Sequence, residues 1–142
     1  MKYLIDTCVI SETQKPSPDR NVLAWFASVR ESDLFFSAVV FGEIENGIEL
    51  LPNGSRKARL VKWLESCHIR YGTQILPFDA SVAREWGRLT AKLQKKGLTK
   101  PVADSQIAAT ALCHNLTLVT RNTKDFVQTG VKLLNPFERV RG

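Results

Sequence analysis

Four acidic segments lie far apart in the sequence, and each places a carboxylate where a parallel α/β sheet would gather it with the others. The segments are Leu4-Ile5-Asp6-Thr7, Phe41-Gly42-Glu43, Pro101-Val102-Ala103-Asp104 and Arg121-Asn122-Thr123-Lys124-Asp125. Each carboxylate follows an apolar, strand-like run or stands in the first turns of a helical pattern. In parallel α/β folds both positions face the edge of the sheet where ligands bind. The sequence therefore predicts one cluster formed by Asp6, Glu43, Asp104 and Asp125.

Such a cluster needs a cation or the protonation of some of its members. Two like charges at about 4 Å repel by about 4 kcal/mol at an effective dielectric constant near 20, so several cannot stay ionised together unaided. Mg²⁺ takes oxygen ligands and keeps several waters. A bound metal lowers the pKa of water and neutralises charge at a phosphate. The net charge of +6 is compatible with a polyanionic partner. Together these features predict metal-dependent phosphodiester chemistry, with Thr7, Ser37 and Asn122 as candidates to orient the carboxylates or hold outer waters.

Strand-like runs that alternate with helical patterns are expected to position these acids. Short apolar runs predict five strands, at 2–6, 34–37, 74–78, 116–120 and 131–134. Apolar residues at helical spacing predict helices at 22–29, 40–51, 58–67, 80–96 and 101–114. This alternation is typical of an α/β fold with a parallel sheet of about five strands flanked by helices.

The predicted topology brings the acids to one edge. Asp6 ends the first strand and so lies at its carboxyl end. A helix that leads directly into a parallel strand runs antiparallel to it, which puts Asp104, in the first turn of the last helix, at the same edge. Glu43 lies within two turns of the start of its helix, which follows the second strand. Asn122 and Asp125 follow the fourth strand. We therefore expect four separate segments to meet there.

Each acid also has a purely structural explanation. Asp104 suits a helix N-terminal dipole, Asp6 could cap a short helix at 7–11, and Asp125 could lie in an exposed turn. Glu12 is either a fifth member of the cluster or an exposed helix residue. The joint pattern, and no single acid, carries the prediction.

Composition restricts the remaining possibilities. The chain has 142 residues, of which 44% are hydrophobic and 24% charged, as expected for one globular domain spanning 1–142. No apolar run approaches the roughly 20 residues of a membrane span, and the N-terminus does not resemble a signal peptide. We expect a cytoplasmic protein. Cys8, Cys67 and Cys113 lack metal-binding or disulfide spacing and are expected to be reduced thiols.

The segment from Tyr3 to Glu12 resembles the opening of PIN-domain ribonucleases, especially the VapC and FitB-type toxins of toxin–antitoxin pairs. Three later blocks match in order: 37–47, 101–111, and 118–122 with Asp125 and Phe126. The resemblance spans essentially the whole chain. It implies a PIN-like, Rossmann-like fold and a metal-dependent endoribonuclease, which hydrolyses RNA phosphodiester bonds through water activated by carboxylate-bound Mg²⁺ or Mn²⁺.

The resemblance also assigns site residues. Asp6, Glu43 and Asp104 match the family's metal-binding acids, and the fourth position falls to either Asn122 or Asp125. Cys8 stands where the family commonly has Asn or Ser. Because a thiol is a poor Mg²⁺ ligand, we interpret Cys8 as a packing substitution.

Partners follow from the same resemblance. It implies a homodimer and a hetero-oligomer with a small, DNA-binding antitoxin of the VapB or FitA kind. Trp25, Phe26, Trp63 and Leu64 are candidate contacts with that partner, although core packing is expected for at least half of them.

Other functions explain part of the pattern. An Mg²⁺-binding, receiver-like signalling domain would need a phosphoacceptor Asp ending strand three and a Lys ending strand five. Asp79 is better explained as a helix N-cap, and Lys132 begins its strand. A non-catalytic RNA-binding module would explain the charge but not the acids.

Overall fold

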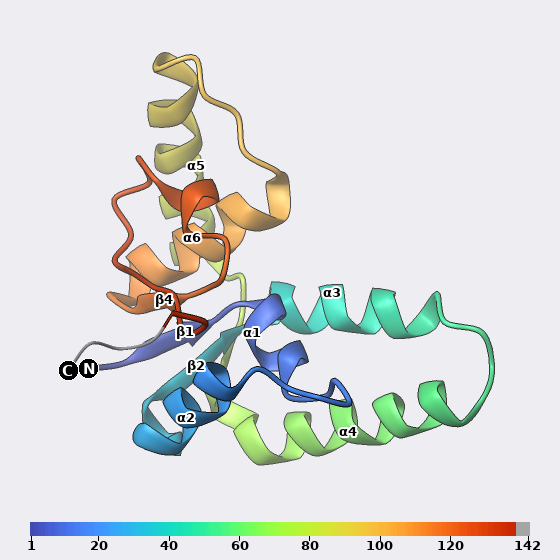
Figure 1. Ribbon diagram of the computed structural model, residues 1–142. Helices are drawn as coiled ribbons and strands as arrows, with labels where there is room; N and C mark the ends of the chain where they lie inside the picture. Colours follow the sequence, from blue (N-terminus) through green and yellow to red (C-terminus); the bar gives the residue numbers. More distant parts are fainter. Residues whose placement is uncertain (139–142) are drawn as a thin grey trace.

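A five-stranded parallel sheet forms the centre of the protein, in the order β3-β2-β1-β4-β5 (Figure 1). The computed structural model describes residues 1–138. The strands are β1 (Tyr3–Ile5), β2 (Leu34–Ser37), β3 (Ile75–Leu76), β4 (Thr117–Val119) and β5 (Leu133–Leu134). The predicted parallel α/β sheet of five strands is confirmed, although most strands are shorter than their apolar runs suggested.

Six α-helices surround the sheet. They are α1 (Thr7–Glu12), α2 (Arg20–Ser28), α3 (Ala38–Glu49), α4 (Ser55–Tyr71), α5 (Ala80–Lys95) and α6 (Val102–His114), in the described part of the chain. Single 3₁₀ turns, η1 (Glu31–Asp33), η2 (Gly72–Gln74) and η3 (Thr123–Phe126), connect some of them. Helix α4 extends past its predicted limits at both ends, and the short helix α1 does begin directly after Asp6.

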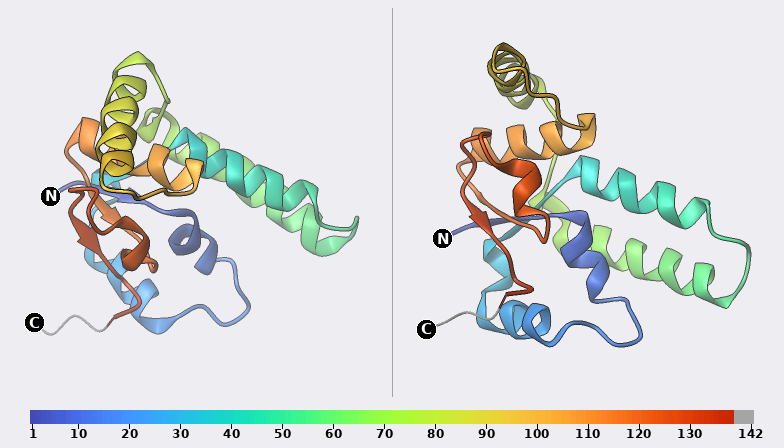
Figure 2. Two further views of the ribbon diagram at one scale, coloured as in Figure 1. Left: turned by 90° about the horizontal axis from the view of Figure 1, so that it is seen from above. Right: turned by 45° about the horizontal axis from the view of Figure 1, so that its top comes forward.

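Two helical lobes flank the carboxyl ends of the strands. Helices α3 and α4 run side by side as an arm that projects from the sheet, and α5 packs against α6 on the other side (Figures 1 and 2). The first turns of α3 and the N-terminal end of α6 face each other between these lobes (Figure 2). The acids of α3 and α6 can therefore meet the one that follows β1.

The central strands are buried on both faces, as their unbroken apolar sequences predicted. Leu4 and Ile5 of β1 and Leu118 of β4 are fully buried, and Leu4 pairs with Leu118 in the parallel ladder. Burial of apolar surface contributes about 25 cal/mol per Å², so this layer fixes the register of β1 against β4. In that register Ile5 lies beside Val119.

Two of the four proposed partner contacts belong to the core. Trp25 and Leu64 are only 6% and 3% exposed. They stabilise the folded chain and are not accessible to a partner. Phe26 and Trp63 are half-buried and pack against the core from its surface. The expectation that at least half of these residues would be core residues is confirmed.

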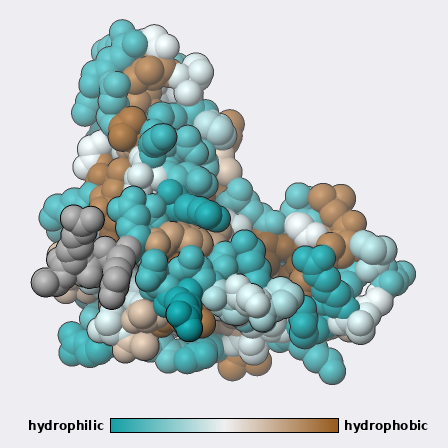
Figure 3. Space-filling model, viewed as in Figure 1, coloured by the Kyte–Doolittle hydropathy of each residue, from teal (hydrophilic) through white to brown (hydrophobic). Residues whose placement is uncertain are grey.

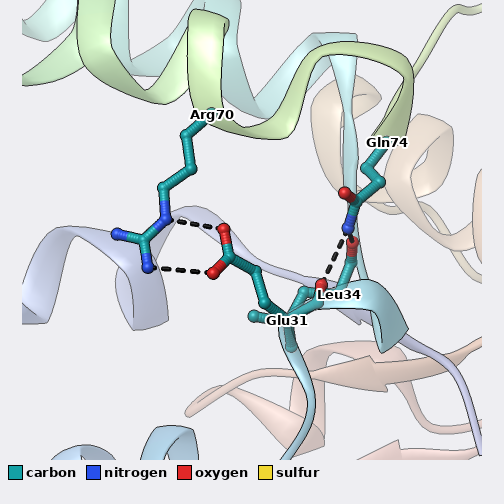
Figure 4. Close-up of polar contacts among 4 residues, drawn as sticks. All are labelled: Glu31, Leu34, Arg70 and Gln74. Carbon is teal, nitrogen blue, oxygen red and sulfur yellow. Dashed lines mark hydrogen bonds and ion pairs between the residues drawn. The ribbon is translucent and has the colours of Figure 1, made fainter.

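A polar junction ties the end of α4 to the start of β2 (Figure 4). The guanidinium of Arg70 donates two hydrogen bonds to the carboxylate of Glu31, at 2.6 and 3.0 Å. The side-chain amide of Gln74 donates to the backbone carbonyls of Glu31 and Leu34. This junction fixes where β2 begins, and therefore where α3 and its acid follow.

None of the helices in residues 1–138 combines the length and apolar character needed to cross a bilayer.

The cap of α5 offers a test of the fold. Oδ1 of Asp79 accepts a hydrogen bond from the backbone N–H of Val82 at 3.1 Å, as its interpretation as an N-cap predicted. We expect Asp79→Ala to lower the free energy of unfolding by about 1 kcal/mol, and Asp79→Asn, which retains a capping oxygen, to lower it by much less. Urea denaturation measures both. Equal effects of the two substitutions would contradict a capping role.

Candidate active site

Asp6 is the most firmly held acid at the carboxyl edge of the sheet. Its Oδ1 accepts a hydrogen bond from the backbone N–H of Thr7 at 2.8 Å, and its Oδ2 accepts one from the hydroxyl of Thr120 at 2.7 Å. Its own N–H donates to the carbonyl of Val119 at 3.0 Å, which continues the β1–β4 ladder by one step. Asp6 is 7% exposed. It therefore caps α1, as one structural explanation predicted, and its carboxylate is held in place by hydrogen bonds to both oxygens.

Glu43 approaches Asp6 through Thr7. The hydroxyl of Thr7 donates to Oε1 of Glu43 at 2.8 Å, which bridges the first turn of α1 and the second turn of α3. The Glu43 side chain is exposed, and the hydrogen bond from Thr7 orients it. Thr7 was predicted to orient a carboxylate, and the structure places it in that position.

Asp104 lies in the first turn of α6, and the negative charges of the other acids affect its pKa. Its pKa is raised, first by burial and then by repulsion from Asp6, Asp125 and Glu43; only Lys100 opposes this. Repulsion of this kind falls off with distance. The other three predicted carboxylates therefore lie near enough to Asp104 to affect its pKa.

A polar contact behind Asp104 fixes its helix. The indole N–H of Trp86 in α5 donates to the hydroxyl of Ser105 at 2.9 Å, and that hydroxyl donates to the carbonyl of Val102 at 2.7 Å. Both hydrogen-bonding functions of Ser105 are satisfied, so α5 holds the N-terminal turn of α6 in place.

The other predicted orienting residues take different positions. Ser37 is buried, and its hydroxyl accepts from the N–H of Val39 as the N-cap of α3. Asn122 precedes η3, and its backbone N–H donates to the Thr120 hydroxyl at 3.1 Å. Asp125 is exposed in η3, where its N–H donates to the carbonyl of Asn122. The chain around Asn122 and Asp125 is thus joined to Asp6 through Thr120.

Cys8 touches this network. Its Sγ lies 3.7 Å from Oδ2 of Asp6 and 3.8 Å from Oγ1 of Thr120. Burial raises the pKa of the thiol, which keeps it protonated and neutral at pH 7. A neutral thiol packed against the carboxylate suits the packing role predicted for Cys8. All three cysteines are free, as expected.

Glu12 is neither exposed nor turned toward the other acids. It is buried, and its carboxylate contacts the ammonium of Lys15 at 2.8 Å and accepts from the N–H of Asp19 at 3.0 Å. The contact with Lys15 lowers the pKa of Glu12. The exposed-residue interpretation was wrong, because Glu12 fastens the loop between α1 and α2.

Sequence reasoning missed Thr120 as a partner of Asp6. Thr120 is fully buried, and its hydroxyl both donates to Asp6 and accepts from Asn122. The parallel pairing of β1 with β4 would have predicted this contact. If β1 and β4 are parallel neighbours, the residues that follow their last pair, Ile5 and Val119, must stand side by side.

The donor set suits a hard divalent cation. Four carboxylates supply only oxygen ligands, the kind that Mg²⁺ and Mn²⁺ prefer. In their present positions no three His, Cys, Asp or Glu side chains of residues 1–138 stand within reach of one ion. Glu43 and Asp125 are exposed and can change rotamer. Burial, and then repulsion from the other acids, raise the pKa of Asp104, and a bound cation would offset the repulsion. The residues present therefore fit such a metal in their chemistry, but not in their present spacing.

Known proteins resemble this chain over most of its length. The PIN domain family matches residues 3–132. Toxin FitB of Neisseria gonorrhoeae is 38% identical over 135 residues, which cover 94% of this chain and 97% of FitB. VapC ribonuclease Y4jK of Sinorhizobium fredii is 35% identical over 136 residues, covering 95% and 97%.

Among solved structures, FitAB bound to an IR36 DNA fragment superposes with a TM-score of 0.91 at 36% identity and covers 97% of both chains. The matched region includes β1 through β4 and all four clustered acids. The chain therefore belongs to the PIN-domain family, among relatives of the FitB and VapC type.

Proposed function

We propose that this protein is a metal-dependent endoribonuclease that acts as the toxin of a toxin–antitoxin pair. The observation that carries the proposal is the meeting of acids from separate segments at one edge of the sheet: Thr7 joins Asp6 to Glu43, and Asp104 lies in the first turn of α6. Relatives named VapC ribonuclease supply the class of reaction. Family membership sets aside the receiver-like alternative.

We assign the metal to three of the acids. Asp6, Glu43 and Asp104 would hold Mg²⁺ or Mn²⁺, with Asp125 as the fourth carboxylate of the site. The bound ion would supply an activated water and neutralise charge at the scissile phosphate. Asp6 is already fixed by Thr7 and Thr120, so little reorganisation is needed there. The backbone N–H of Asn122 donates to Thr120, and the Asn122 side chain is the alternative to Asp125 at the fourth position of the site.

We further propose a DNA-binding antitoxin as the partner. The similar solved structures include FitAB on DNA, in which the toxin relative is assembled with a second protein. The proposal also includes a single domain over 1–142, a homodimer, and a cytoplasmic location where RNA is available.

The first test is cleavage of a mixed tRNA and rRNA pool by protein freed of any partner. We expect discrete cuts with Mg²⁺ or Mn²⁺ that disappear with EDTA and fall at least about 100-fold in Asp6→Asn and Glu43→Gln, because a lost ligand removes the metal. Glu49→Gln, an exposed acid on the same helix as Glu43, should cut normally. Cutting that survives Asp6→Asn would refute the assignment, and RNA binding without any cutting would favour the non-catalytic module.

The raised pKa of Asp104 predicts a pH effect on stability. A carboxyl whose pKa is higher when folded binds its proton more tightly in the native state, so it destabilises the protein as pH rises through that interval. In EDTA, Asp104→Asn should therefore raise Tm at pH 7, and the difference should vanish at a pH below the usual Asp pKa. Saturating Mn²⁺ should reverse the order, because it binds the native wild type. Thermal melts at several pH values measure this; a lower Tm for Asp104→Asn in EDTA at pH 7 would contradict it.

A separate prediction concerns the hydroxyl of Thr120. Thr120→Val keeps the side-chain volume but removes the hydroxyl that orients Asp6. We expect Mn²⁺ affinity and cleavage to fall by about 10- to 100-fold. Thr120→Ser, which restores the hydroxyl, should recover most of the loss. Calorimetric titration with Mn²⁺ and cleavage rates provide the two readouts, and equal behaviour of the Val and Ser variants would exclude a role through the hydroxyl.

A further inference from the structure

Arg121 lies between two residues of the hydrogen-bonded network around Asp6. The hydroxyl of Thr120, the residue before it, donates to Asp6, and the backbone N–H of Asn122, the residue after it, donates to that hydroxyl. Neighbouring Cα atoms are about 3.8 Å apart, so the backbone of Arg121 is fixed beside the candidate active site. Arg121 is exposed. Hydrophilic side chains cover most of the surface around the junction of the two helical lobes (Figure 3).

An aromatic ring holds the guanidinium of Arg121 in place. Its Cζ lies 4.6 Å from the centroid of the Phe137 ring, where the face of the ring attracts a cation. The segment that carries this ring is tied to the same loop. The side-chain amide of Asn135 donates to the carbonyl of Arg121 at 3.4 Å, and its Oδ1 accepts from the N–H of Phe137 at 3.0 Å. Asn21 of α2 donates to the carbonyl of Phe137 at 2.8 Å.

The guanidinium of Arg121 has free hydrogen-bond donors. It takes part in none of the ion pairs of residues 1–138. Its charge contributes to the lowered pKa of Glu12, but the Glu12 carboxylate is already bonded to Lys15 and to the N–H of Asp19. The N–H groups of a stacked guanidinium lie in its own plane and not toward the ring. They can therefore form the two parallel hydrogen bonds with which arginine binds a phosphate.

We propose that Arg121 binds a phosphate of the RNA backbone next to the scissile one, and that Phe137 positions the guanidinium for this contact. The proposal rests on the proposed ribonuclease function and deepens it, because it assigns a residue that holds the substrate strand beside β4. Arg121 adjoins the residues that fix Asp6. A strand whose scissile phosphate lies at Asp6 would therefore bring a neighbouring phosphate within reach of Arg121.

Binding is measured in the Asp6→Asn background, so that affinity is read without cleavage. The probe is a short, 5′-fluorescein-labelled RNA of random sequence, and its anisotropy is followed over a range of KCl concentrations. We expect Arg121→Ala to weaken binding about fivefold and to reduce the slope of log K against log salt by about 0.7, the value of one phosphate contact on a single strand. Arg121→Lys keeps the charge and should retain the slope. Lys132→Ala removes an equal, exposed charge before β5, at the opposite edge of the sheet, and should leave the slope nearly unchanged.

The positioning role of Phe137 has a test of its own. Phe137→Leu removes the aromatic face and should weaken RNA binding about threefold, whereas Phe137→Tyr retains the face and should bind normally. A double-mutant cycle separates positioning from folding. If the ring acts through the guanidinium, Phe137→Leu has no further effect on affinity in Arg121→Ala. Equal losses with and without the guanidinium would show that Phe137 acts on the fold alone, and would overturn its positioning role.

Cleavage by the active protein gives the second readout. A contact made equally with the substrate and the transition state changes KM alone, so Arg121→Ala should raise KM about fivefold and leave kcat within about twofold. Unchanged RNA affinity and salt slope in folded Arg121→Ala would overturn the proposal. The binding assay does not depend on catalysis. Absence of cleavage therefore counts against the proposed function, and unchanged binding counts against the role of Arg121 alone.

Discussion

The parallel pairing of β1 with β4 is the constraint on which the site depends. It places the residues that follow these strands, Asp6 and Thr120, side by side at the carboxyl edge, where the buried hydroxyl donates to the carboxylate at 2.7 Å. The same hydroxyl accepts from the backbone of Asn122. One residue therefore connects the first acid to the loop that carries the last. A one-residue shift of β1 against β4 would put these two side chains on opposite faces of the sheet.

The arrangement stores electrostatic repulsion in the native state. Asp104 is partly desolvated and faces three other carboxylates, which raises its pKa. Hydrogen bonds position the elements around it: Trp86 of α5 donates to Ser105 at the start of α6, and Arg70 of α4 donates to Glu31 ahead of β2. Under the proposed function, a bound cation would relieve this repulsion.

Much of the architecture could be predicted because it follows from chain-wide patterns. Unbroken apolar runs predicted the buried strands. The parallel topology that follows from them predicted that Asp6, Glu43, Asp104 and Asp125 lie at one edge of the sheet. What failed depended on local tertiary contacts. Glu12 has the composition of an exposed helix residue, yet Lys15 and the N–H of Asp19 hold it in a buried position.

Other differences have the same origin. Helix α4 begins before its predicted apolar stripe, since its first turn is made of polar and charged residues whose helical state the pattern does not reveal. It also continues past Cys67 to Tyr71, which is buried in the core. Trp25 and Leu64 are core residues, whereas Phe26 and Trp63 lie at the surface of the core. Their sequence spacing does not distinguish these cases, because the distinction depends on tertiary contacts such as the edge-on contact of Trp25 with Tyr3 of β1.

The central claim is that carboxylates from β1, α3 and α6 form one cation site. Calorimetric titration of Mn²⁺ into wild type and into Asp6→Asn, Glu43→Gln and Asp104→Asn measures this most directly. The account predicts saturable binding to the wild type that each substitution weakens at least about tenfold, because every acid contributes to the same site. Wild-type affinity retained in any two of the three variants would show that these acids do not share a metal, and would contradict the account.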